Sequence, residues 1–114
     1  MEAWQVAVSA AQAKKAEDIS VLDLAQIASF TNCFVICHGL NSRQNQAICD
    51  EVEKQLKEEG VRPVSVEGYQ HAEWILMDYG DFVVHIFTRR ARDYYDLERL
   101  WKTARKLTVP EEEA

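Results

Sequence analysis

Apolar and polar positions recur along the chain with two different periods, which predicts a mixture of helices and strands. Near the N-terminus, Trp4, Val8, Ala11 and Lys15 fall on one face of a helix. Residues 18–24 then have the composition of a strand. Residues 31–39 are apolar at nearly every position, and such a run is typical of a strand that is buried on both faces. We therefore expect this second strand to lie in the middle of a sheet.

A long helix is expected after the second strand. Asn41 or Ser42 can cap its first turn, and Gly60 follows its last residue in the position where helices commonly end. One face carries apolar side chains four residues apart: Ile48, Val52 and Leu56. Residues 64–66 form a short strand, and Pro63 places that strand near a sheet edge. The strand–helix–strand order predicts a right-handed crossover between parallel strands.

The C-terminal half is predicted to contain a hairpin and a last helix. Residues 74–77 and 82–87 are apolar and flank a short turn that contains Gly80, which is typical of a β-hairpin. Residues 91–106 are expected to form a helix with this apolar stripe: Tyr94, Leu97, Leu100, Trp101 and Ala104. Together these elements predict one α/β domain over residues 1–109, with a mixed sheet of roughly five strands flanked by helices. Residues 110–114 form an acidic tail that we expect to be disordered.

Composition narrows the class of protein. The net charge of −6 disfavours sequence-specific binding to bare nucleic acid and suits a basic protein partner. No apolar run approaches the roughly 20 residues that span a membrane, and the N-terminus lacks the features of a secretory signal. The odd number of cysteines (Cys33, Cys37 and Cys49) argues against a disulfide framework and favours buried thiols in a reducing compartment. We therefore expect a cytoplasmic protein.

No set of residues with the spacing of a catalytic site was found. Residues 39–42 join a strand to a helix but lack a phosphate-binding glycine motif, so a helix cap is the favoured interpretation. Asp78 and Asp81 are the candidates for a divalent metal, although they flank a hairpin turn. His85 lies in the middle of a strand, where a buried, hydrogen-bonded histidine is favoured over a general base. The expectation is no catalytic residue, no metal and no cofactor.

A cluster of aromatic and acidic residues around the hairpin predicts a site for a protein partner. Its members are Glu67, Glu73, Trp74, Asp78 and Tyr79. Tryptophan and tyrosine are enriched at interfaces, and carboxylates beside them would complement a basic partner. Strand alternation puts Trp74 and Leu76 on one face and Ile75 and Met77 on the other. From the sequence alone, Trp74 can be either an interface residue or a core residue.

Several stretches of the chain, in this order and spacing, resemble the Iojap or ribosomal silencing factor family. They are KKAEDISVLDL at 14–24, TNCFVICHGLNSRQ at 31–44, VEGYQHAEWILMDYGDFVVHIF at 66–87 and ARDYYDLERLW at 91–101. The resemblance covers nearly the whole chain, and its most specific parts are the block from Glu67 to His85 and the YDLE-x-LW ending. The chain departs from common family patterns at His38 and at residues 30–32.

The resemblance implies a fold similar to nucleotidyltransferases without the metal-binding carboxylates of those enzymes. It also implies binding to ribosomal protein fourteen of the large ribosomal subunit, which sterically blocks joining of the small subunit and represses translation. Family members are often homodimers when free. Two alternatives stay open at this point. One is a nucleotidyltransferase-like enzyme that uses Asp78 and Asp81, and the other is an assembly factor of the large subunit.

Overall fold

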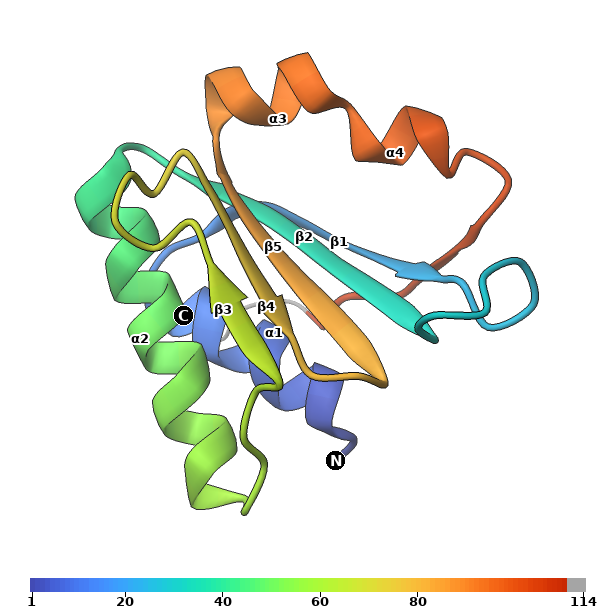
Figure 1. The fold of residues 1–114 in the computed structure, drawn as a ribbon, viewed down its shortest axis with the longest axis horizontal. Helices are drawn as coiled ribbons and strands as arrows, with labels where there is room; N and C mark the ends of the chain where they lie inside the picture. The colour runs from blue at the N-terminus through green and yellow to red at the C-terminus, as the bar shows by residue number, and fades with distance from the viewer. Residues whose placement is uncertain (111–114) are drawn as a thin grey trace.

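Six strands form one mixed sheet, with helices on both of its sides (Figure 1). The computed structural model describes residues 1–110. In chain order the elements are α1 (Ala3–Ala13), β1 (Glu17–Asp23), β2 (Cys33–Gly39), α2 (Ser42–Glu58), β3 (Ser65–Glu67), β4 (Trp74–Asp78), β5 (Phe82–Thr88), α3 (Arg89–Tyr95), α4 (Leu97–Leu100) and β6 (Arg105–Leu107). The predicted α/β class and mixed sheet are confirmed, with six strands in place of roughly five.

The strands lie in the order β3-β4-β5-β2-β1-β6. Strands β2 and β5 pair in parallel, and the other neighbouring pairs are antiparallel. The predicted hairpin is confirmed as β4 and β5, with Trp74 opposite Phe87. The crossover from β2 through α2 to β3 does join strands of the same direction. However, the two strands of the hairpin, β5 and β4, lie between them in the sheet.

Every residue of β2 is buried, which confirms its predicted central position. Strand β4 alternates instead: Ile75 and Met77 are fully buried, whereas Trp74, Leu76 and Asp78 are half-buried. Its two faces therefore meet different surroundings.

One side of the sheet, which we call the closed face, is covered by α1 and α2 (Figure 1). Its core contains Val8 of α1, Val52 of α2 and Met77 of β4, all at most 1% exposed. Helix α2 begins as predicted, because the Asn41 side-chain oxygen accepts a hydrogen bond from the backbone N–H of Gln44 at 2.9 Å. It ends before Gly60, which has a positive φ of 79°. The helix pattern read from the sequence is thus confirmed at both ends.

The three thiols belong to this closed face. Cys33, Cys37 and Cys49 are free and buried in its core, as expected. Burial raises the pKa of each thiol to about 12. They are packing residues and stay protonated at neutral pH.

The prediction of one continuous helix over residues 91–106 was wrong. Helix α3 ends at Tyr95, and Asp96 adopts the left-handed conformation with φ 48° and ψ 55°. A short second helix, α4, follows at an angle to the first, and residues 105–107 pair with β1 as the edge strand β6. The sixth strand therefore comes from the segment expected to end the last helix.

Two further expectations concern the C-terminal tail and the absence of a membrane-spanning segment. The predicted disordered tail falls mainly on residues 111–114, which lie outside the described residues. Within residues 1–110, no helix has the length and apolar character needed to cross a membrane.

Candidate functional site

The second side of the sheet is only half covered. Helices α3 and α4 lie over it on the β5, β2 and β1 side (Figure 1), where Phe34, Ile36 and Phe87 are buried. Strands β3 and β4 lie beyond these helices, and the β4 side chains on this side are half-buried. We call the uncovered part the open face. It carries Glu67, Trp74, Leu76 and Asp78, because Glu67 pairs with Leu76 and paired residues share a face.

Trp74 is the large side chain at the edge of the open face, and it is held from three sides. Its ring lies 4.6 Å from that of Tyr95 and 5.0 Å from that of Phe87, measured between centroids. Its indole Nε1–H donates to Nδ1 of His85 at 3.0 Å. Trp74 is therefore packed by its neighbours and only partly exposed, which is an arrangement that suits a pre-organised contact residue.

His85 is buried beneath Trp74, with 3% of its surface exposed. Its Nδ1 must be the unprotonated nitrogen, because it accepts from an indole that can only donate. Burial lowers the pKa of the ring to about 4, so the side chain is neutral at physiological pH. The predicted buried, hydrogen-bonded histidine is confirmed at Nδ1.

The acidic residues of the predicted cluster do not all have the same role. Glu67 and Glu73 are exposed, so their charges face solvent at the border of the open face. Asp78 is half-buried, and its Oδ1 accepts the backbone N–H of Gly80 at 2.8 Å, which stabilises the hairpin turn. Within residues 1–110, no three metal-ligating side chains converge on one point, and Asp81 lies in the turn beside Asp78.

The placement of Tyr79 with this cluster needs correction. Its ring stacks on Phe82 at 4.8 Å and is 8% exposed, within the core of the closed face. Strand alternation explains the difference, because residue 79 continues the series of Ile75 and Met77. The structure places Glu67, Trp74 and Asp78 on one face of the sheet, with Trp74 and Asp78 at opposite ends of β4. Glu73 precedes Trp74 in the chain, and Tyr79 lies in the core of the other face.

A second group of aromatic residues borders the covered part of the same side. The Phe30 ring lies 6.1 Å from that of Phe34 and 6.0 Å from that of Trp101. Phe34 in turn meets the His85 ring at 4.4 Å, so aromatic contacts run from Trp74 to Phe30. Phe30 is 59% exposed although its ring takes part in these contacts. The sequence did not indicate this position, because Phe30 lies in a connecting segment with no periodic pattern.

A polar cluster holds α3 and α4 in place. Arg92 makes two hydrogen bonds to Glu98, at 3.0 and 3.2 Å, and a third to Nδ1 of His38 at 2.9 Å. The Ser20 hydroxyl also donates to Glu98 at 3.0 Å, and Nε2 of His38 lies 3.4 Å from a Glu17 carboxylate oxygen. We call these five residues the clamp. It joins α3 and α4 to the ends of β1 and β2.

The clamp changes the ionisation of its members. Burial acts to raise the pKa of Glu98, but the hydrogen bonds and charge of Arg92, with the Ser20 hydrogen bond, outweigh it and the pKa is lowered. For His38, burial and then the Arg92 charge lower the pKa, so the ring is a neutral acceptor for Arg92. Sequence reasoning missed the clamp because its members are far apart in the chain.

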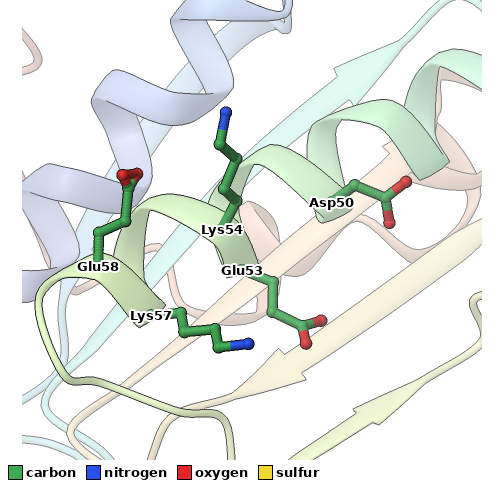
Figure 2. A pocket seen from close by; sticks show the side chains of 5 residues that line it. All are labelled: Asp50, Glu53, Lys54, Lys57 and Glu58. Carbon is green, nitrogen blue, oxygen red and sulfur yellow. The ribbon is translucent and has the colours of Figure 1, made fainter.

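The outer side of α2 carries a hollow of a different kind. It has a volume of about 620 Å³ and is lined by Asp50, Glu53, Lys54, Lys57 and Glu58. Figure 2 shows that these side chains fan out from a single helix and do not point toward a common centre. Binding sites for small molecules have converging polar groups in an apolar cavity, so this hollow has the character of a solvated helix surface.

Comparisons with known proteins agree on one family. The family model for RsfS, ribosomal silencing factor during starvation, matches residues 1–114. The ribosomal silencing factor RsfS of Halalkalibacterium halodurans is 44% identical over 103 residues, which cover 90% of this chain and 88% of that protein. A solved structure of a Chromobacterium violaceum protein is 36% identical with a TM-score of 0.85, and the match covers 98% of this chain and 95% of that one.

A more distant relative has a different name. The mouse protein named mitochondrial assembly of ribosomal large subunit protein 1 is 31% identical over 97 residues, which cover 82% of this chain and 42% of that protein. The bacterial relatives are named as ribosomal silencing factors. Since the family model spans the whole chain and the identity extends over nine-tenths of it, this chain belongs to the ribosomal silencing factor family.

Proposed function

We propose that this protein binds ribosomal protein fourteen of the large ribosomal subunit through the open face, and that it sterically blocks joining of the small subunit. Translation is then repressed for as long as the complex lasts. The observation that supports this proposal is the uncovered half of the sheet, where a half-buried tryptophan is bordered by carboxylates. The membership of the family supports the choice of the ribosome as the partner.

The chemistry of the open face suits a basic protein. Trp74 and Leu76 supply apolar surface, and interfaces draw most of their affinity from a few such anchors. Glu67, Glu73 and Asp78 add negative charge around them, on a chain whose net charge is −6. Carboxylates at the rim accelerate association with a positively charged partner and make it sensitive to salt. Tyr79 contributes to the core only.

The direct test is Trp74→Ala in a pelleting assay with purified large subunits. We expect binding to weaken by about 2 kcal/mol or more, which is roughly 30-fold in affinity. Tyr69→Ala is the matched control. Tyr69 is also partly exposed, but its hydroxyl donates to Asp50 of α2 and so lies on the other side of β3. The control should pellet like the parent.

The same variants should be melted in parallel. A Trp74→Ala protein that melts like the parent and pellets fully would contradict the proposed contact. If the variant instead unfolds, with the 3–5 kcal/mol loss of a core aromatic, Trp74 is a core residue and the contact surface is assigned wrongly. The half-buried state of Trp74 leads us to expect a smaller stability loss than this.

The steric block needs its own experiment. Large subunits, small subunits and the protein are mixed, and the particles are separated on a sucrose gradient. We expect fewer joined ribosomes as the protein is added, and no such effect from Trp74→Ala. Normal joining in the presence of saturating bound protein would contradict the proposed mechanism while leaving the binding intact.

We further propose that the free protein is a cytoplasmic homodimer. Apolar side chains remain exposed on it, including Phe30 and Leu100, at 59% and 72%. Large exposed apolar groups are commonly covered by a partner. Sedimentation equilibrium at about 10–100 µM, a range chosen because dimerisation depends on concentration, should show a dimer, and a strict monomer there would contradict this part.

A role in assembly of the large subunit is the second candidate, because the mouse relative is named for that process. It predicts that cells lacking the protein accumulate large-subunit precursors. Subunit joining in a purified mixture would be unchanged in that case. Gradient profiles of extracts from a deletion strain, compared with the purified joining assay, separate the two functions.

A further inference from the structure

The histidine below Trp74 takes up the only hydrogen-bond donor of the indole ring. Nε1–H of Trp74 is bonded to Nδ1 of His85 at 3.0 Å, and an indole has no second polar atom. The polar edge of the ring is therefore turned toward the sheet. What remains of Trp74 on the open face is the carbon surface of its rings.

The cost of having a histidine at this position suggests that it has a role. With Nδ1 as the acceptor, Nε2 carries the proton, and this buried donor has no hydrogen-bond partner within residues 1–110. A leucine could fill the same space and would remove this unsatisfied donor, although it would also leave the Trp74 indole N–H without its acceptor. Its neighbours on this side, Phe34 and Phe87, are themselves apolar. Packing alone does not explain the histidine.

The hydrogen bond from Trp74 to His85 can fix the orientation of the indole ring. Tyr95 and Phe87 contact the Trp74 ring at 4.6 and 5.0 Å with their planes tilted to it, and such apolar ring contacts alone do not fix the rotation of the indole. A single hydrogen bond at the ring edge fixes the rotation. Because the histidine is neutral, its acceptor is present throughout the physiological pH range.

We propose that His85 is a positioning residue, which orients Trp74 so that the open face presents a fixed apolar ring surface to its partner. The group that docks on this ring is then an aliphatic or cationic side chain, not a hydrogen-bond acceptor. The carboxylates of Glu67, Glu73 and Asp78 favour a lysine or arginine, whose carbon stem can lie along the ring. This inference rests on the proposed function, in which the open face binds a basic ribosomal protein.

The test is a double-mutant cycle on large-subunit binding, with His85→Leu and Trp74→Phe made singly and together. His85→Leu removes the acceptor, and Trp74→Phe keeps a ring but removes the donor. We expect His85→Leu alone to weaken binding about tenfold, which is within the usual range for coupled neighbours. In the Trp74→Phe background the same change should alter binding less than about twofold, because the hydrogen bond is already gone.

A spectroscopic readout separates positioning from general stability. In ¹⁵N spectra the Trp74 indole N–H, assigned by its absence in Trp74→Phe, should exchange slowly with solvent in the parent. His85→Leu should remove this protection without lowering the melting temperature, since an unpaired buried donor is lost as well. His85→Gln, whose side-chain oxygen can accept, should restore part of both protection and binding.

Each outcome bears on the proposal. Loss of indole protection with unchanged binding would overturn the positioning role, as would equal effects of His85→Leu in both backgrounds. If His85→Leu unfolds, the folded His85→Gln protein decides: parent-like protection with binding weakened tenfold or more would overturn the proposal, and parent-like values of both support it. Failure of the proposed function looks different, because Trp74→Ala would then bind fully while the hydrogen bond in the parent persists.

Discussion

Replacing Glu98 with glutamine removes the negative charge of the clamp and keeps the side-chain shape. The charge of Arg92 would then have no acid partner at Glu98, although its side chain is only 10% exposed. Breaking a fully buried pair costs about 3–5 kcal/mol. The cost here is smaller because Glu98 is 28% exposed and because glutamine still offers one oxygen to Arg92 or to Ser20. We expect a loss of about 2 kcal/mol, the scale of a hydrogen bond to a charged group.

For a domain of this size, such a loss lowers the melting temperature by about 8 °C. Thermal and urea unfolding, followed by circular dichroism, measure it. Glu73→Gln is the matched control, since its exposed carboxylate makes no hydrogen bond or ion pair within residues 1–110. The control should melt within about 1 °C of the parent, because isolated surface charges contribute little.

The pH dependence makes the prediction specific to charge. The pKa of Glu98 is lowered by folding, so its contribution is present above the pKa of the unfolded carboxyl and is lost as the pH falls through the lower, folded pKa. The difference between parent and Glu98→Gln should therefore be full at pH 7 and shrink below about pH 4. Equal melting temperatures at pH 7 would refute the clamp as a stabilising unit. A difference independent of pH would refute its electrostatic origin.

Two further substitutions test the packing on either side of β4. Tyr79→Phe should leave the free energy of urea unfolding unchanged or raise it slightly, because the buried Tyr79 hydroxyl has no hydrogen-bond partner within residues 1–110; a loss above about 1 kcal/mol would show a partner for this oxygen. Gly68→Ala should cost more than Gly60→Ala, which we expect to cost about 1 kcal/mol; both have positive φ, but a methyl group at Gly68 would collide with the Trp74 carbonyl oxygen, whereas Gly60 faces open space. Equal unfolding free energies for these two variants would argue against that collision.

The elements with a complete local pattern could be predicted from the sequence. The central position of β2 followed from its unbroken apolar run, and the start of α2 from Asn41. The prediction of one continuous last helix was wrong, and the reason is a contact that local sequence patterns do not reveal. Arg92 and Glu98 are six residues apart, which puts them on different sides of one continuous helix. The two hydrogen bonds between them require the break at Asp96.

The candidate site, too, could be predicted from the sequence only in part. Alternation correctly put Trp74 and Leu76 on one face of β4, opposite Ile75 and Met77. It could not say which face would be covered, because that depends on where α3 and α4 lie over the sheet. Their position is set by the clamp, which joins residues 17 to 98. Which residues belong to the proposed binding surface could therefore be seen only from the tertiary structure.

The positions of the cysteines make thiol alkylation a probe of how often the helical layer of α1 and α2 separates from the sheet. All three thiols lie under α1 and α2, and none lies on the side where Trp74 meets solvent. An alkylating reagent needs a thiolate, so it reacts only when that helical layer lifts from the sheet. Its rate therefore reports how tightly the far side of the domain is held, without touching the open face. If a partner bound to the open face slows alkylation, its binding stabilises the packing of α1 and α2 on the opposite side of the sheet.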